Sequence, residues 1–201
     1  VEGGRSHSLT LDLRHRPAFL YRDIYPGQAE IPGLYRRKVR QNSSGTAELG
    51  FSERYGSPRG VHSMHLYSAD FPKEISWMNK NGTRQVVDTP HNGSICFSQP
   101  EALDRFEAKL RDYVRQDRAR SDETGAPYPV FYVVDMNDCA VECFCPECQA
   151  FIKEHDVSGL VIHFMNRLWD RVAGDFPDIY LMMFAYHDST TPPPSGLRPK
   201  G

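Results

Sequence analysis

Three polar residues follow an apolar run near the middle of the chain. Val130–Val134 are apolar or aromatic, and Asp135, Asn137 and Asp138 come directly after them. In parallel β/α folds, ligands bind at the carboxyl ends of the strands, so a strand over this run would place these groups at a binding site. A carboxyl there could act as a general acid, or stay ionised and stabilise a developing positive charge. Alternatively, Asp135 or Asp138 caps the following turn or pairs with an arginine.

Four cysteines lie immediately after this segment. Cys139, Cys143, Cys145 and Cys148 are spaced C-x3-C-x-C-x2-C. Four thiolates at these spacings could close a tetrahedral zinc site, although a standard structural site uses two separated C-x2-C pairs. Disulfides in an oxidising compartment and reduced buried thiols are the alternatives. The fifth cysteine, Cys96, lies in an apolar run and is interpreted as a small core residue.

Histidine and aromatic side chains are candidates for contacting a substrate. His62 and His65 are close enough in sequence to lie at one mouth of a site, and Tyr186 ends the last apolar run; His91 and His187 are further candidates. Sugars stack on aromatic rings, but Tyr186 is equally suited to packing. Nucleotide binding is not indicated, because neither G-x-G-x-x-G nor G-x-x-x-x-G-K-[ST] occurs. A serine nucleophile elbow is absent as well.

Four short apolar runs, 18–25, 94–97, 130–135 and 179–186, are rich in residues that favour strands. A helix is expected after the second run, with Ser98 as its cap and Glu101 completing a capping box. Its apolar stripe is Leu103, Phe106, Leu110 and Val114. Another is expected from Ser158 to just before Gly174, preceded by a short helix over 146–154. The alternation of strand and helix predicts an α/β fold with parallel strands. The segment 35–67 is expected to be mostly loop.

Length and composition are those of one globular domain. The chain has 201 residues, of which 39% are hydrophobic and 25% charged, and its net charge is −2. These values exclude wholesale disorder, a collagen-like chain and a coiled coil, and they give no strong attraction for nucleic acid or an anionic membrane. No run approaches the ~20 apolar residues of a spanning helix. Because the chain begins with valine and ends in a loop-like segment, we expect a processed or excised piece.

Several short motifs follow one another in a recognisable order along most of the chain. The earlier ones are Phe19-Leu-Tyr-Arg-Asp23, His62-Ser63, Asn81-Gly-Thr-Arg84 and Ile95-Cys-Phe-Ser-Gln-Pro100. The later ones are Asn137-Asp138, Cys143-Phe-Cys-Pro-Glu-Cys148, Phe164-Met-Asn166, Phe176-Pro-Asp178 and Phe184-Ala-Tyr186. Through them the chain resembles a bacterial family catalogued as domain of unknown function 4838. Some members of that family are classed as endo-β-N-acetylglucosaminidases acting on complex N-glycans.

The resemblance implies a (β/α)8-type catalytic barrel related to families that hydrolyse hexosaminides and glucuronides. A full TIM barrel typically needs ~250 residues, so we expect a single domain over 1–201, truncated at its C-terminus, with about five β/α units. By the resemblance, Asp138 is the general acid. Families that use the substrate's acetamido group as nucleophile place two adjacent carboxylates there, whereas this chain has Asn137-Asp138. Either Asn137 orients the amide, or Asp135 does, or a second carboxylate lies in the missing half.

Further expectations follow from the same resemblance. Arg22, His62, His65 and Tyr186 would contact a glycan substrate, in a protein located in the periplasm or secreted by a bacterium. No cofactor would be required for catalysis; a structural zinc, with Cys139, Cys143, Cys145 and Cys148 as ligands, rests on the cysteine spacing and keeps disulfides and reduced thiols as its alternatives. Cys139 departs from the family pattern and enlarges a three-cysteine cluster to four. The alternatives are a non-catalytic carbohydrate-binding domain and a zinc-stabilised interaction domain.

Overall fold

Two long helices carry the apolar stripes that their sequences predict. The computed structural model describes residues 55–58 and 60–200. Helix α3 spans Pro100–Thr124 and begins with proline at its first turn, where the missing N–H costs nothing. The residues of its predicted stripe, spaced three and four apart, are all buried; they are Leu103, Phe106, Leu110 and Val114. Gly125 ends the helix in a left-handed conformation, with φ of 66°.

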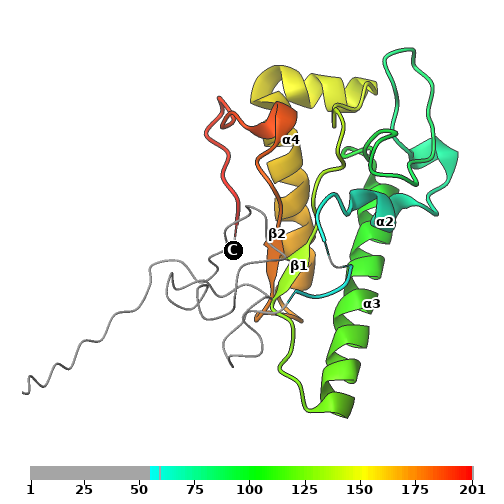
Figure 1. The fold of residues 1–201 in the computed structure, drawn as a ribbon. Helices are drawn as coiled ribbons and strands as arrows, with labels where there is room; N and C mark the ends of the chain where they lie inside the picture. The colour runs from blue at the N-terminus through cyan, green and yellow to red at the C-terminus, as the bar shows by residue number, and fades with distance from the viewer. Residues whose placement is uncertain (1–54, 59, 201) are drawn as a thin grey trace, which may run out of the picture. The chain divides into compact units, whose positions relative to one another are not determined.

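Helix α4 spans Pro146–Val172 and is bent at Asp156, where φ is 63° and ψ is 173°. Figure 1 shows its first part lying across the end of the second, which runs alongside the strands. The Asp156 carboxylate accepts a hydrogen bond from the Val157 N–H at 2.7 Å, so it helps to cap the second part. The expectation of a short helix followed by a second one from Ser158 is confirmed by these two parts.

The two strands are short and parallel. Strand β1 spans Phe131–Val133, and β2 spans Tyr180–Met182. Phe131 pairs with Tyr180 and Val133 with Met182, with α4 as the connection between the strands. On its other side β1 forms a single parallel bridge between Phe131 and Tyr55. The described residues therefore form a mixed arrangement of helices and a small parallel sheet, as expected for an α/β fold.

Three short helices complete the described elements: α2 over Met64–Ser68 and the 3-10 helices η3 over Lys73–Ile75 and η4 over His187–Ser189. The segment 35–67, expected to be mostly loop, therefore ends within α2, whose five residues are too few for a recognisable periodicity. The described residues belong to one compact unit, Glu53–Gly201. The apolar run 18–25 lies outside the described residues. Among the helices of residues 55–58 and 60–200, none has the length and hydropathy to cross a membrane.

The expected strand over 94–97 is wrong. Ile95 makes one antiparallel bridge, to Ser76, and the chain then turns toward the cysteine cluster. The expected Ser98 cap is wrong too: Gln99 is the N-cap of α3 and makes no side-chain capping bond. The Ser98 hydroxyl instead lies 3.3 Å from the Cys145 sulfur. The Ser98 hydroxyl, which the local pattern predicts as the helix cap, therefore contacts the cysteine cluster instead.

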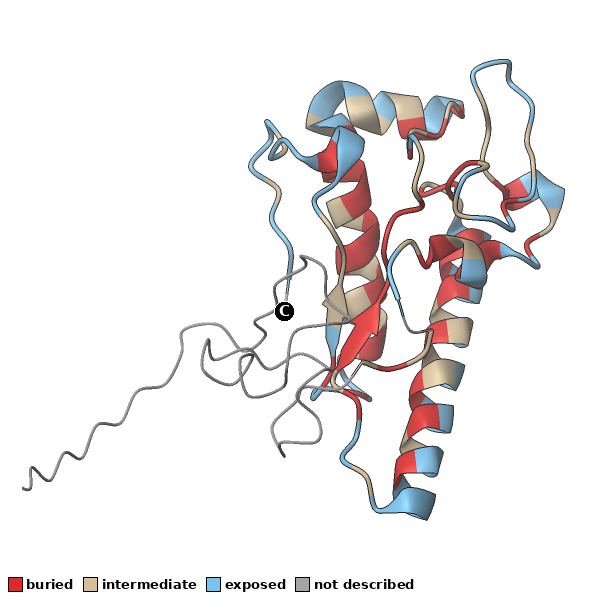
Figure 2. Ribbon diagram, viewed as in Figure 1, coloured by how far each residue is buried: buried red, intermediate tan, exposed pale blue. Residues whose placement is uncertain are grey.

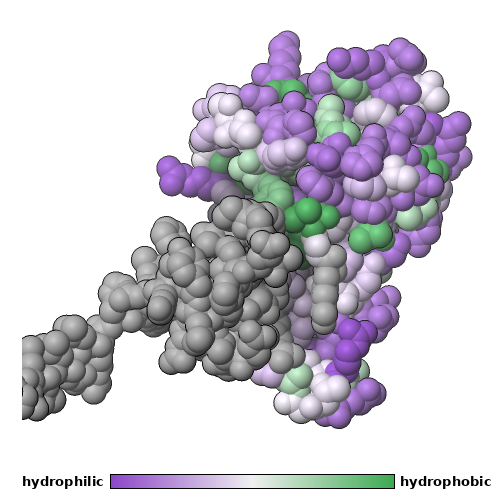
Figure 3. Space-filling view, viewed as in Figure 1, coloured by the Kyte–Doolittle hydropathy of each residue, from purple (hydrophilic) through white to green (hydrophobic). Residues whose placement is uncertain are grey.

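Aromatic rings join the helices into one core. Tyr67 of α2 stacks on Phe106 of α3, with ring centroids 4.2 Å apart. Phe106 in turn meets Phe164 of α4 edge-on, at 5.3 Å. Figure 2 shows buried residues along β1 and recurring bands of them along α3 and α4. On the face seen in Figure 3, hydrophilic residues predominate outside small hydrophobic patches.

Candidate active site and cysteine cluster

Asp135 stands just beyond β1 and binds backbone on two sides. Its Oδ2 accepts a hydrogen bond from the His62 N–H at 3.1 Å, and its Oδ1 accepts one from the Phe184 N–H at 2.9 Å. The residue is 1% exposed. Because each carboxylate oxygen accepts from a main-chain donor, Asp135 holds together the segments that precede α2 and follow β2.

Asn137 has a similar role. Its Oδ1 accepts from the His65 N–H at 2.9 Å, and its Nδ2 donates to the Gly93 carbonyl at 2.8 Å. It is fully buried. The polar atoms of Asp135 and Asn137 are thus both bound to backbone, and the role of either residue in orienting an acetamido group stays a prediction.

Asp138 differs from both, because its carboxylate is 38% exposed and surrounded by side chains. Tyr186 donates its hydroxyl to Oδ1 at 3.2 Å. The same oxygen lies 4.0 Å from His62 Nε2 and 3.8 Å from His187 Nε2, and Oδ2 lies 3.8 Å from His91 Nδ1. The hydrogen bond to Asp138, followed by desolvation and the carboxylate's charge, raises the pKa of Tyr186. The structure therefore gathers a carboxylate, a phenol and three imidazoles from loops far apart in sequence.

Two of these imidazoles are carried by strained backbone. His62 has φ of 57° and His187 has φ of 47°, a left-handed region that non-glycine residues occupy at a cost. His62 Nδ1 lies 2.8 Å from the Met136 carbonyl, which can only accept. Nδ1 therefore donates to this carbonyl, and Nε2 is the ring nitrogen that faces Asp138. Strain of this kind is common where a side chain must be aimed at a site.

Of the other residues predicted to contact a substrate, His65 supports the backbone near the site and Tyr186 lies at Asp138. The His65 ring donates through Nδ1 to the His62 carbonyl at 2.7 Å, so it supports the histidine segment. Tyr186 lies at the Asp138 carboxylate. Arg22 lies outside the described residues. His91 and His187, which were secondary candidates by sequence, converge on the carboxylate, a result of tertiary structure that no spacing rule reveals.

A second group of reactive side chains is the cysteine cluster, formed by Cys96, Cys143, Cys145 and Cys148. The four residues are buried, and their sulfurs all lie within 4.8 Å of one another. The predicted membership was wrong in one position. Cys139 is not in the cluster: its thiol donates to the Gly93 carbonyl at 3.1 Å, and burial raises its pKa. Cys96 takes the fourth position, although it was interpreted as a core residue.

The surroundings of the cluster suit thiolates. Met78 N–H donates to Cys143 Sγ at 3.5 Å, and Cys148 N–H to Cys145 Sγ at 3.4 Å. Hydrogen bonds from Cys143 and Cys148 lower the pKa of Cys145 to about 5. Burial lowers the pKa of Arg84, but a hydrogen bond to Cys96 and the charges of the neighbouring thiolates outweigh it, so the net shift is upward. Arg84 is therefore a cation held beside the sulfurs.

The sulfur geometry is compatible with a metal. All five cysteines of the chain are described and none forms a disulfide. Cys96 Sγ and Cys145 Sγ lie 3.5 Å apart, near the separation of about 3.8 Å that follows from Zn–S bonds of ~2.3 Å in a tetrahedron. The cluster is thus a buried set of four soft ligands that could bind a metal ion.

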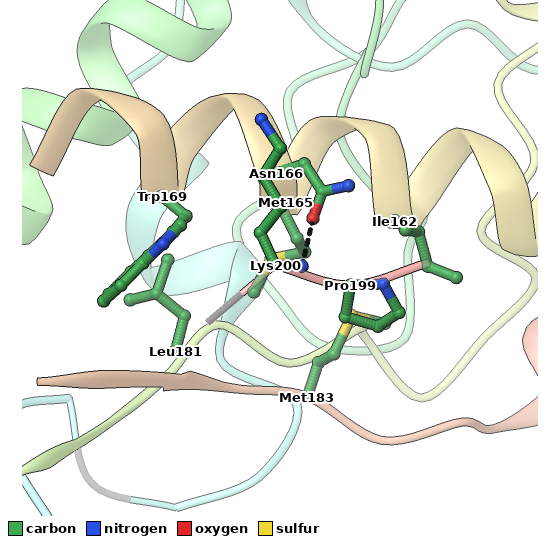
Figure 4. Close-up of a pocket in the computed structure, with 8 residues that line it drawn as sticks. All are labelled: Ile162, Met165, Asn166, Trp169, Leu181, Met183, Pro199 and Lys200. Carbon is green, nitrogen blue, oxygen red and sulfur yellow. Dashed lines mark hydrogen bonds between the residues drawn. The ribbon is translucent and has the colours of Figure 1, made fainter. Parts of the chain in front are cut away.

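A small hollow lies apart from these residues, between α4, β2 and residues 199–200 (Figure 4). Asn166 closes it by donating to the Arg198 carbonyl at 2.9 Å and accepting from the Lys200 N–H at 2.8 Å. Its lining is largely apolar; the residues are Ile162, Met165, Asn166, Trp169, Leu181, Met183, Pro199 and Lys200. None of the predicted site residues lines it, so it is not the candidate active site.

Comparison with known sequences supports the resemblance seen in the motifs. Residues 6–200 match the model of a family described as Domain of unknown function (DUF4838), and the chain belongs to that family. No curated protein and no solved structure matches it. The description of the family states no activity, so a function has to be inferred from the site.

Proposed function

We propose that this chain is part of a glycoside hydrolase acting on amino-sugar-containing glycans, with Asp138 as the general acid. The supporting observation is the contrast between the three strand-end residues: Asp135 and Asn137 are bound to backbone, whereas Asp138 is partly exposed among polar side chains. A protonated Asp138 would deliver its proton to the glycosidic oxygen as the bond to the anomeric carbon breaks. We further propose that the parallel β1–α4–β2 unit belongs to a partial (β/α)8 barrel.

The neighbours of Asp138 have roles in this proposal. Tyr186, His62 and His187 could hydrogen-bond sugar hydroxyls, and Tyr186 could also stack on a sugar ring. An acetamido nucleophile would be oriented by Asn137, by Asp135 or by a second carboxylate elsewhere in the protein. We also propose a bacterial periplasmic or secreted location, which export of the tagged natural protein would test.

The decisive experiment is product analysis by mass spectrometry with the full natural chain. N-glycans, chitin oligosaccharides and glucuronide-bearing glycans serve as substrates. Asp138→Asn should lower kcat/KM by about 100-fold or more, while Asp112→Asn, an exposed carboxylate on α3, should leave it unchanged. A glycoside whose leaving group needs no protonation should be affected much less by Asp138→Asn. Equal turnover of natural glycans by Asp138→Asn and the wild type would refute the assignment.

One outcome would favour a different class of function. Tight glycan binding with no product from the folded wild-type chain would indicate a carbohydrate-binding domain. In that case Asp138→Asn should weaken glycan binding, since the carboxylate would act there only as a hydrogen-bond acceptor.

We also propose that the cysteine cluster holds a structural zinc ion. Zinc favours four thiolate ligands in a closed tetrahedral site, and such a site stabilises the fold without taking part in chemistry. Arg84 would offset part of the negative charge of four thiolates bound to one divalent ion. Elemental analysis should find about one zinc per chain in the wild type and in Cys139→Ser, and a large loss in Cys96→Ser. A loss in Cys139→Ser equal to that in Cys96→Ser would contradict this ligand set.

A further inference from the structure

Two loops meet at the Asp138 carboxylate. The acid loop, residues 137–143, carries Asp138, and the facing loop, residues 88–96, carries His91. The Gly93 carbonyl of the facing loop accepts from Asn137 Nδ2 at 2.8 Å and from Cys139 Sγ at 3.1 Å. These two bonds lie on either side of Asp138 in the sequence. The position of the carboxylate therefore depends on where the facing loop lies.

Trp77 supports both loops. A Cβ atom built on Gly93 would lie 2.7 Å from Trp77 Cε3, so the indole packs directly against the facing loop. Its Nε1 donates to the Glu142 carbonyl of the acid loop at 2.8 Å. Next to Trp77, Met78 accepts from the Phe144 N–H at 2.9 Å and donates its own N–H to Cys143 Sγ. One short segment thus connects the loops with the cysteine cluster.

Each loop also ends on a cysteine of the cluster: the facing loop on Cys96 and the acid loop on Cys143. In sequence Cys96 is distant from the other three, which lie at the end of the acid loop and directly after it. A metal bound to all four sulfurs would link the ends of the two loops directly. Thiols alone would link them weakly, because S–H groups are poor donors and acceptors.

We propose that a metal ion in the cysteine cluster positions Asp138, by fixing the facing loop against the acid loop. This inference rests on the proposed function of Asp138 and on the proposed zinc site, and it gives the metal a role at the candidate active site. Gly93, Asn137 and Trp77 transmit the constraint, and they act as positioning residues rather than catalytic ones.

The test is hydrogen–deuterium exchange of the full natural chain, with zinc bound and after removal of zinc by a chelator. Exchange of the amides in 88–96 and 137–143 should rise by about tenfold or more on zinc removal. After zinc removal the loop amides should exchange much faster than those in the middle of α3, because Phe106 packs α3 into the core and its amides exchange only when the whole chain unfolds. Cys96→Ser should reproduce the effect in the presence of zinc, Cys139→Ser should retain protection of both loops, and Cys96→His, which keeps a ligand for zinc, should restore it.

Glycan cleavage measured in parallel separates this inference from the proposed function. Cleavage should fall together with loop protection and return when zinc is added back. Unchanged exchange in both loops after confirmed zinc removal would overturn the inference, even if Asp138→Asn is inactive. Loop amides that still exchange as slowly as those in the middle of α3 after zinc removal would overturn it too, because the loops would then open only with the whole fold. Increased loop exchange together with full cleavage by Asp138→Asn would refute the proposed function instead.

Discussion

Replacing Cys96 with serine should destabilise the zinc-bound chain far more than the same change at Cys139. Cys96 and Cys145 are 49 positions apart in the sequence. A cross-link across such a loop restricts the unfolded chain, and the loop-entropy relation for disulfides gives about 4 kcal/mol for this length. The other three ligands span short loops, so Cys96 supplies the long-range part of the cross-link.

The contrast with Cys139 makes this a matched comparison. Serine at Cys139 retains a donor toward the Gly93 carbonyl, and we expect a cost below about 1 kcal/mol. For a chain of this size, 1 kcal/mol shifts Tm by roughly 2–4 °C. Cys96→Ser should therefore lower Tm by about 8–16 °C with zinc bound, and Cys139→Ser by a few degrees at most.

Thermal unfolding followed by circular dichroism, in excess zinc and in excess chelator, measures both effects. With chelator, most of the gap between the two variants should disappear, because the cross-link is then absent from both. A gap of the same size with and without zinc would refute the reasoning, since the loss would then come from packing around Cys96 rather than from ligation.

Further predictions concern the supports of the site and its surroundings. Asn137→Asp should lower stability by about 1–3 kcal/mol without raising activity, because it removes the buried donor to the Gly93 carbonyl; a gain in turnover would contradict the positioning role. Gly93→Ala should cost about 1–3 kcal/mol in urea unfolding, because its Cβ would meet Trp77, whereas Gly82→Ala, also at positive φ but in open space, should cost less. Burial and then the charges of Arg167 and His155 lower the pKa of His163, so the neutral ring favours the folded state. That stability is complete above the unfolded pKa of about 6.5 and is lost as the pH falls below it. The variant His163→Gln should therefore show a smaller fall of Tm on acidification than the wild type. The same dependence of Tm on pH in both proteins would contradict this role of His163.

The parts of the fold set by local periodicity could be predicted from the sequence. The stripe of α3 and the interruption before Ser158 follow from apolar spacing and from residues that favour helix ends, and both agree with the structure. The run at 94–97 has the composition of a strand, but polar side chains in and just after it make tertiary contacts with the cysteine cluster. Cys96 and Ser98 point their sulfur and oxygen toward Cys145, so the segment turns instead of extending a sheet.

The candidate site, like the fold, is predictable where the local sequence decides and not where tertiary contacts decide. The strand end at Asp135–Asp138 was found from the rule that ligands bind at the carboxyl ends of parallel strands. The sequence does not reveal which of these polar side chains bind backbone, because that depends on the main-chain donors of His62, His65 and Phe184. The cluster spacing identified three ligands close in sequence but selected Cys139 as the fourth, since a ligand from a distant segment leaves no spacing signal.

The supports of the site have a consequence for how such a site can change over time. Asp135 and Asn137 hold the main-chain N–H groups of His62, His65 and Phe184, and they make no demand on the side chains at those positions. Any residue except proline offers the same N–H. Position 62 can therefore exchange its side chain for others that tolerate its left-handed backbone, while this main-chain bond stays intact. One architecture could thus be retuned from one substrate to another by single substitutions.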